Sequence, residues 1–94
     1  MITISVQGYL TFKALVGKRQ VSIPSGSLLQ DLLDSLREDS DQRFVNEAYS
    51  TSGRLKEHIA VMLNGKPYRN LPDGVRTVLK DGDQVAIFPP IIGG

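Results

Sequence analysis

The residues best suited to chemistry are the two glycines that finish the sequence, Gly93 and Gly94, which follow a Pro89-Pro90-Ile91-Ile92 segment. Glycine has no Cβ, so such a pair can pass through a narrow channel and let its backbone approach a second molecule closely. The prolines fix φ and keep the chain before the glycines extended. We therefore expect the working group to be the carboxylate of Gly94 rather than a side chain.

The rest of the composition argues against a catalytic site within this chain. It contains no cysteine and a single histidine, His58. The lack of cysteine excludes disulfides, thiolate metal ligands and a cysteine nucleophile. No set of nucleophile, base and orienting group is recognisable. We therefore expect no bound cofactor or metal, and we expect the catalytic groups to belong to partner enzymes.

Charge and hydropathy limit the kinds of partner. The formal net charge of the 94 residues is +1, which argues against a strong nucleic-acid binder. No apolar run approaches the ~18 residues of a membrane span, and no basic and apolar leader precedes the first strand pattern. We expect a cytoplasmic protein. Bases gather in residues 54–80 and acids in residues 31–47. The basic stretch is either an ordinary solvated surface or a face that steers an acidic partner.

Four stretches have the pattern of β-strands. Residues 2–7 alternate apolar and polar side chains, as a strand does when one face is buried. Residues 20–23 repeat this pattern and stop before a proline. Residues 59–63 are apolar on both faces, which is typical of a central strand. Residues 84–88 form the last predicted strand.

The strongest helix pattern covers residues 28–38, where four leucines at three- and four-residue spacing make one apolar stripe. We expect Ser27 to be its N-cap, with Gln30 as the partner in a capping box. A second, short helix is predicted around residues 44–49. Residues 8–18 are predicted to form a helical turn or a wide loop.

Three short segments predict turns. Asn64-Gly65 favours a tight hairpin after the central strand, with residues 68–71 as the return arm. Pro72-Asp73-Gly74 predicts a second turn. Asp81-Gly82-Asp83 predicts a third, because it lacks the further ligands and the closing glutamate of a calcium loop.

The order of these elements predicts an α+β fold. The helical stretch between the second and third strands is long enough for a crossover that packs one helix on one face of a sheet. A mixed sheet of four or five strands on one main helix is the β-grasp, or ubiquitin-like, architecture. We expect residues 1–88 to form this domain and residues 89–94 to form a flexible, extended C-terminal tail.

Residues 79–94 read LKDGDQVAIFPPIIGG. This segment resembles the C-terminal signature of the ubiquitin-like sulfur carriers of the MoaD and ThiS family, roughly L-x-D-G-D-x-V-A-x-F-P-P-x-x-G-G. The branch that it resembles most is the small subunit of molybdopterin synthase. The helix start at residues 27–36 and the Asn64-Gly65 turn also fit. Gly53-Arg54-Leu55 resembles archaeal and cysteine-synthesis carriers equally well, so the pathway stays open.

The resemblance implies a sequence of reactions at Gly94. An activating enzyme, an adenylyltransferase of the MoeB and ThiF type, would use ATP to adenylate the terminal carboxylate. Sulfur would then replace AMP and leave a thiocarboxylate. The acceptor would be the large subunit of molybdopterin synthase or another sulfur-accepting enzyme. The chain itself would be a non-catalytic carrier, the small subunit of a sulfurtransferase.

A partner-binding surface is predicted next to the tail. Exposed apolar and aromatic residues commonly anchor protein interfaces. The candidates are the residues from the last strand into the tail and one aromatic residue after the hairpin: Phe88, Pro89, Pro90, Ile91, Ile92 and Tyr68. Core packing is the alternative role for Phe88, and a structural role is the alternative for Tyr68 and His58.

Three functions remain open from the sequence. The first is a sulfur carrier, most simply for molybdopterin, with thiamine, cysteine and tRNA thiolation as other destinations. The second is a protein modifier that is joined to target lysines through Gly94. The third is a non-covalent binding module that uses a sheet edge or the basic face and does not need the glycines.

Overall fold

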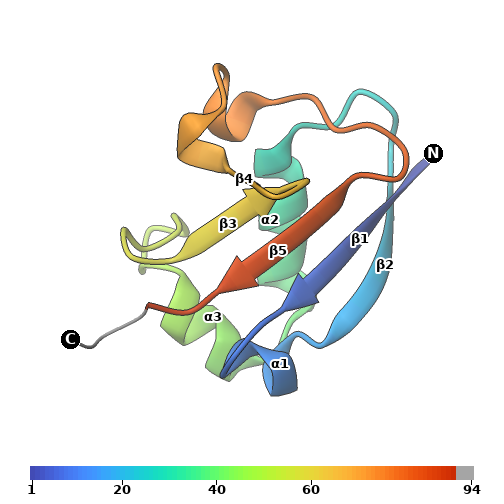
Figure 1. Ribbon diagram of the computed structural model, residues 1–94. Coiled ribbons are helices and arrows are strands. Elements are labelled where there is room, and N and C mark those ends of the chain that lie inside the picture. The colour runs from blue at the N-terminus through green and yellow to red at the C-terminus, as the bar shows by residue number, and fades with distance from the viewer. Residues whose placement is uncertain (91–94) are drawn as a thin grey trace.

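The computed structural model describes residues 1–90. Five strands form one mixed sheet in the order β2-β1-β5-β3-β4 (Figure 1). Their bounds are β1 Ile2–Gly8, β2 Lys18–Ile23, β3 Ala60–Leu63, β4 Lys66–Pro67 and β5 Gln84–Phe88. Strand β1 pairs antiparallel with β2 and parallel with β5, and β3 pairs antiparallel with β5 and β4. The predicted β-grasp fold is confirmed.

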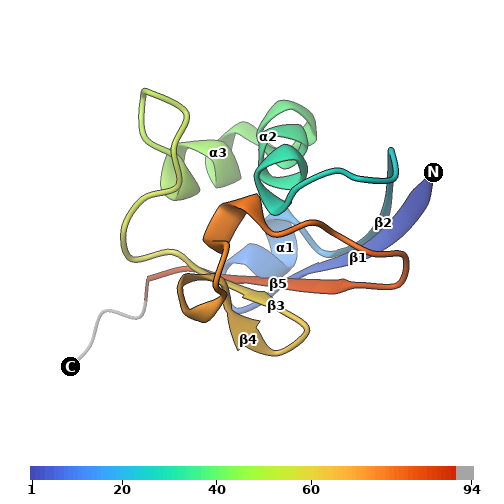
Figure 2. The ribbon, with the colours of Figure 1, turned by 90° about the horizontal axis from the view of Figure 1, so that it is seen from above.

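Helices cover one face of this sheet. Figure 2 shows the main helix α2 and the short helix α3 together on the same side, with the sheet seen nearly edge-on. The helices are α1 Phe12–Leu15, α2 Leu29–Asp39 and α3 Gln42–Ala48, and two short 3-10 helices are η1 Tyr68–Asn70 and η2 Gly74–Arg76. The opposite face, which we call the open face, carries no α-helix among residues 1–90.

The core lies between the sheet and α2. All four stripe leucines of α2 are buried, as their spacing predicts. The strands contribute alternate residues to the same core. Phe12 of α1 and Phe44 of α3 add two rings that meet edge to face, with their centroids 4.9 Å apart. The core residues that are fully inaccessible are Ile4, Val6, Phe12, Leu29, Leu32, Phe44, Ala48 and Ile87. One contiguous core therefore joins both ends of the sequence.

The predicted start of α2 is wrong by one residue. Leu28, not Ser27, is the N-cap, and its backbone N–H donates to the carboxylate of Asp31 at 2.8 Å. Ser27 bonds to a different segment instead, because its carbonyl accepts the N–H of Leu79 at 2.9 Å. Gln30 donates to Asp34 on the next turn instead of capping the helix.

The hairpin turn is confirmed, and its return arm is corrected. Asn64 and Gly65 both have positive φ, 52° and 83°, as the two central residues of a type I′ turn require. The return strand is only Lys66–Pro67, and Tyr68–Asn70 forms a 3-10 helix instead of the predicted extended arm. A proline has no N–H for the next ladder bond, so the strand ends there.

Within residues 1–90, no helix is both long and apolar enough to cross a membrane.

Candidate functional site at the end of the last strand

Strand β5 is the last strand of the sheet, and it is followed by Pro89 and Pro90, the last described residues. It lies between β1 and β3, so its last residues are held from both sides. Ile87 pairs with Gly8, its carbonyl accepts the N–H of Tyr9 at 3.0 Å, and Phe88 pairs with Ala60. Beyond the strand, Pro89 is still buried. The end of β5, which we call the exit, is therefore held by backbone hydrogen bonds within the sheet.

Phe88 faces away from the core. Residues along β5 alternate in burial, with Val85 and Ile87 buried and Phe88 half-buried on the open face. Its ring stacks on that of Tyr9, with centroids 4.7 Å apart and ring planes 12° apart. Core packing, the alternative role for Phe88, is therefore replaced by a surface aromatic pair.

A shallow hollow lies next to this pair. Its volume is about 300 Å³, and its apolar lining comes from Tyr9, Met62, Ala86 and Phe88. Polar and basic side chains complete the lining, among them Ser5, Gln7, Lys18 and Gln84. An apolar floor with a polar rim is the arrangement found at protein-binding surfaces.

A second hollow of similar volume lies across β3 from the first. Met62 lines both, so the two form neighbouring depressions on one surface. The second is lined by Ala60 and Pro67 and by the polar residues His58, Tyr68 and Arg69. Phe88 and Tyr68, the two predicted aromatic contacts, thus line separate hollows on either side of β3.

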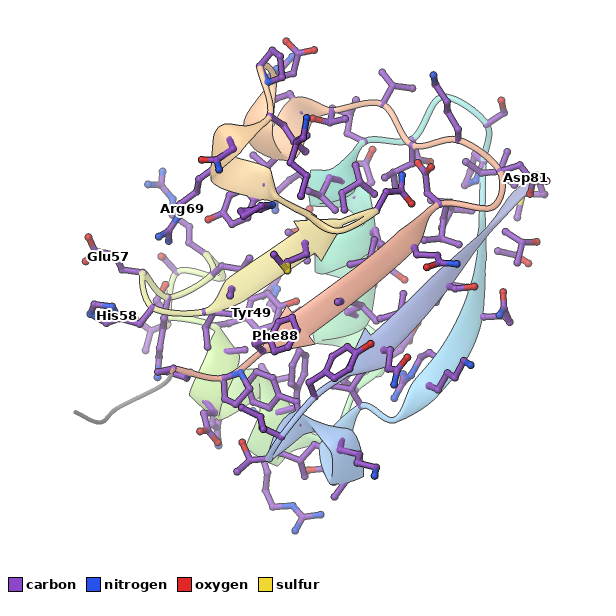
Figure 3. The ribbon with its side chains drawn as sticks, in the orientation of Figure 1. Tyr49, Glu57, His58, Arg69, Asp81 and Phe88 are labelled. Carbon is purple, nitrogen blue, oxygen red and sulfur yellow. The ribbon has the colours of Figure 1, made fainter. Side chains whose placement is uncertain are left out.

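Arg69 ties the hairpin to the segment that precedes β3. Its guanidinium donates to the backbone carbonyl of Glu57 and lies 5.4 Å from the centroid of the Tyr68 ring. Figure 3 shows Arg69, Glu57 and His58 close together beside the start of β3. Since Ala60 pairs with Phe88, this polar group flanks the exit of the chain. One member of the predicted basic face is therefore brought to the candidate site.

Within the described residues 1–90, the one ionisable group with a large pKa shift, Tyr49, lies in the core and has a structural role. Burial raises the pKa of Tyr49, nearby Asp34 raises it further, and Arg37 opposes the change. The Tyr49 hydroxyl stays protonated and donates to the carbonyl of Leu33 at 2.7 Å. Among residues 1–90, no group of three His, Cys, Asp or Glu side chains is placed to hold a metal ion.

The residues predicted to do the chemistry lie outside the described part of the chain. These are Gly93 and Gly94, together with the predicted contacts Ile91 and Ile92. Pro90, the last described residue, is half-buried. The structure thus describes the end of β5 and the residues around it, which we call the platform, as far as Pro90.

Two residues of this platform were not predicted. Tyr9 follows β1 directly, and it meets Phe88 only because β1 and β5 run parallel side by side. Met62 lies in the strand predicted at residues 59–63, whose residues are apolar on both faces, so the sequence does not show which face of the sheet Met62 occupies. The β-grasp topology itself was the signal that could have found Tyr9, since it places the ends of the first and last strands together.

Both the sequence and the fold of this chain are similar to those of known proteins. The ThiS family profile matches residues 10–94. The small archaeal modifier protein 3 of Haloferax volcanii is 31% identical, with 97% of this chain and 98% of that protein covered. The small archaeal modifier protein 1 of Methanosarcina acetivorans has a similar structure, with a TM-score of 0.82, 25% identity, and coverage of 100% and 98%. A Pyrococcus furiosus protein described as a putative subunit 1 of a molybdopterin converting factor shares the fold, with a TM-score of 0.72, 23% identity, and coverage of 97% and 100%.

Proposed function

The chain belongs to the ThiS family of ubiquitin-like sulfur carriers and modifiers, and from this premise we propose that it carries sulfur as a thiocarboxylate on Gly94. The observation that carries the proposal is the Phe88-Pro89-Pro90 segment that leads from a firmly held strand into the two glycines. The side chains of the sequence form no recognisable set of nucleophile, base and orienting group that could do this chemistry instead.

The chemistry begins with activation, because a carboxylate is a poor electrophile. The Gly94 carboxylate oxygen attacks the α-phosphorus of ATP on a partner enzyme and releases pyrophosphate, which leaves a mixed anhydride with AMP. A sulfide-level donor then attacks the Gly94 carbonyl carbon and displaces AMP. Glycines suit both steps, since without a Cβ the backbone can lie close to a nucleotide.

The chain contributes position rather than catalysis. Strand β5 delivers the tail from a fixed point, and Pro89 and Pro90 restrict φ on its first part. This restriction lowers the entropy that is lost when the tail enters a partner. The two hollows beside Phe88 and Tyr68 provide the docking surface for the activating enzyme and then for a sulfur-accepting enzyme.

Molybdopterin synthesis is the pathway that we propose first. The FPP-x-x-GG ending resembles the small subunit of molybdopterin synthase, and in that role the acceptor is the large subunit of the synthase. The Pyrococcus furiosus neighbour supports only the shared fold, because its identity is below the level at which function transfers. Reconstitution with a synthase large subunit and a pterin precursor tests this pathway directly.

An intact-mass measurement tests the carrier function. The chain is produced together with its activating enzyme, ATP and a sulfur source, and is then weighed. We expect the mass increase of one oxygen-to-sulfur replacement, located at Gly94 by fragmentation. A variant that lacks Gly94 is the control, and it should fold normally and stay unmodified. An unchanged mass of the wild-type chain under these conditions contradicts the proposal.

Protein modification is the second candidate function. The relative at 31% identity is named a small archaeal modifier protein, and conjugation would start from the same adenylate. Here the ε-amine of a target lysine attacks the Gly94 carbonyl carbon of this adenylate, displaces AMP with loss of a proton from the amine, and forms an isopeptide bond. Denaturing electrophoresis of the tagged chain from its native cells separates the two functions, because a ladder of conjugates favours the modifier and a single band favours the carrier.

A further inference from the structure

Leu10 combines two unfavourable features in one residue. Its φ is 55°, in the left-handed region that residues with a Cβ rarely adopt. Its side chain is apolar, yet 64% of it is exposed. Asparagine is several-fold enriched in this backbone region and is at home in water, so an asparagine here would remove both penalties. Backbone strain of this kind clusters at active sites and ligand-binding segments.

Backbone hydrogen bonds on both sides hold the turn that contains Leu10. The Tyr9 N–H donates to the carbonyl of Ile87, and the Phe12 N–H donates to the carbonyl of Tyr9, each at 3.0 Å. The carbonyl of Leu10 itself accepts the N–H of Lys13 at 3.0 Å. Because Phe12 is fully buried, the turn between β1 and α1 cannot relax without disturbing the core. The leucine side chain is therefore held outward.

Leu10 also lies beside the exit of the tail. It follows Tyr9, whose ring stacks on Phe88 and whose N–H bonds to β5. Four residues separate Pro90 from the terminal carboxylate, and four extended residues span at most about 14 Å. An enzyme that acts on that carboxylate must bring its surface within this distance of Pro90, and so must approach the rim of the exit.

We propose that Leu10 is an anchor that inserts into an apolar recess on the enzyme that adenylates the chain. This inference rests on the proposed function and names a residue by which the activating enzyme recognises the chain. The adenylating enzyme is the occupant because both fates, sulfur carriage and conjugation, begin with adenylation. Because backbone hydrogen bonds already fix the turn that carries Leu10, binding does not have to order that turn when the side chain is buried in the complex.

The variant Leu10→Asn separates recognition from stability. ATP–pyrophosphate exchange by the activating enzyme is measured against the concentration of the chain, and thermal unfolding is measured in parallel. We expect the KM for Leu10→Asn to rise by at least about tenfold, the effect of losing one interface anchor, with kcat unchanged. Its Tm should equal or exceed that of the wild-type chain, since the strain is relieved.

Val78→Asn is the matched control. Val78 is also exposed, at 52%, but it lies at an isolated bridge to Leu28 that is remote from the exit. We expect its KM to match the wild-type value. The anchor is overturned if Leu10→Asn also keeps the wild-type KM. It is equally overturned if Leu10→Asn slows only sulfur transfer to the acceptor, or if it only dissolves a dimer of the wild-type chain in ultracentrifugation.

Failure of the underlying function has a different signature. If the wild-type chain supports no pyrophosphate exchange with its activating enzyme, the proposed function itself is wrong, and the inference is overturned with it. If the wild-type chain supports exchange and Leu10→Asn does so equally well, only the anchor is wrong.

Discussion

Tyr9 and Phe88 stack nearly parallel, with ring centroids 4.7 Å apart, although they come from opposite ends of the sequence. The parallel pairing of β1 with β5 brings them together, since Gly8 pairs with Ile87. Both residues line the first hollow on the open face, at the end of β5. The pair therefore links the N-terminal strand mechanically to the point from which the tail begins.

A double-mutant cycle should detect this link. Tyr9→Ala and Phe88→Ala should each lower the free energy of unfolding, and the pair should show a coupling of about 0.5–1.5 kcal/mol, the range for stacked aromatic rings. Urea denaturation gives all three values. Tyr9→Ala combined with Tyr68→Ala is the control pair, because Tyr68 lines the other hollow, and it should be additive. An additive Tyr9 and Phe88 pair would contradict the link.

Periodicity was sufficient to predict the sheet and the main helix. The alternation in β1 and β2 is set by a sheet that buries one face, and the leucine stripe of α2 is set by the same core. Asn64-Gly65 predicted its turn because few residues accept two positive φ values in succession. These features depend on neighbours in the sequence, which is why they could be recognised without tertiary contacts.

The features that were missed depend on distant partners. Ser27 is a good N-cap by type, but the N–H of Leu79 takes its carbonyl and moves the cap to Leu28. The return arm was predicted at residues 68–71, whereas the strand ends at Pro67 after two residues. At the site, the tail was predicted by its own residues, but Tyr9 was not, because its role depends on the register of β1 against β5.

Gly8 should be essential because α1 packs against it. A Cβ built on Gly8 would lie 2.4 Å from the carbonyl oxygen of Phe12 and 2.9 Å from the Cβ of Val16. Gly8→Ala should therefore lower the free energy of unfolding by about 3 kcal/mol, the upper part of the range for overpacking. Urea denaturation provides the measurement.

Gly82→Ala is the control for Gly8. Gly82 has a positive φ of 88° but open space around it, so its alanine variant should lose only about 1 kcal/mol, from backbone strain. If the two variants lost equal stability, the close packing of α1 would not explain the glycine at position 8.

Asn64 should stabilise the fold through its side chain as well as its backbone. Its amide donates to a carboxylate oxygen of Asp83 at 3.0 Å and its carbonyl accepts the N–H of Gln84 at 2.9 Å. Asn64→Gly keeps the left-handed turn and removes both bonds. It should lower the free energy of unfolding by about 1 kcal/mol, and chemical denaturation at neutral pH measures the loss.

Asn64→Asp should convert the same contact into a repulsion that depends on pH. The introduced carboxylate would face Asp83, and each like charge would raise the pKa of the other in the folded state. The folded protein would then bind protons more readily than the unfolded chain, so the variant should regain stability as the pH falls toward about 4. Asn64→Gly, which lacks the second carboxylate, should show no such recovery. A similar pH profile for both variants would contradict the repulsion.

Tyr49 should make the fold sensitive to alkali. Burial raises the pKa of its hydroxyl in the folded state above the unfolded value of about 10. Between these two values the unfolded chain has lost the proton and the folded chain keeps it, so stability falls as the pH rises above about 10.

Tyr49→Phe should lose about 1 kcal/mol at pH 7, because the hydrogen bond to Leu33 is removed. Above pH 10, however, its free energy of unfolding should fall less steeply than that of the wild-type chain. Tyr9 and Tyr68 remain in both proteins, so the difference between the two denaturation profiles isolates Tyr49. Parallel profiles above pH 10 would show that the buried hydroxyl does not govern the alkaline transition.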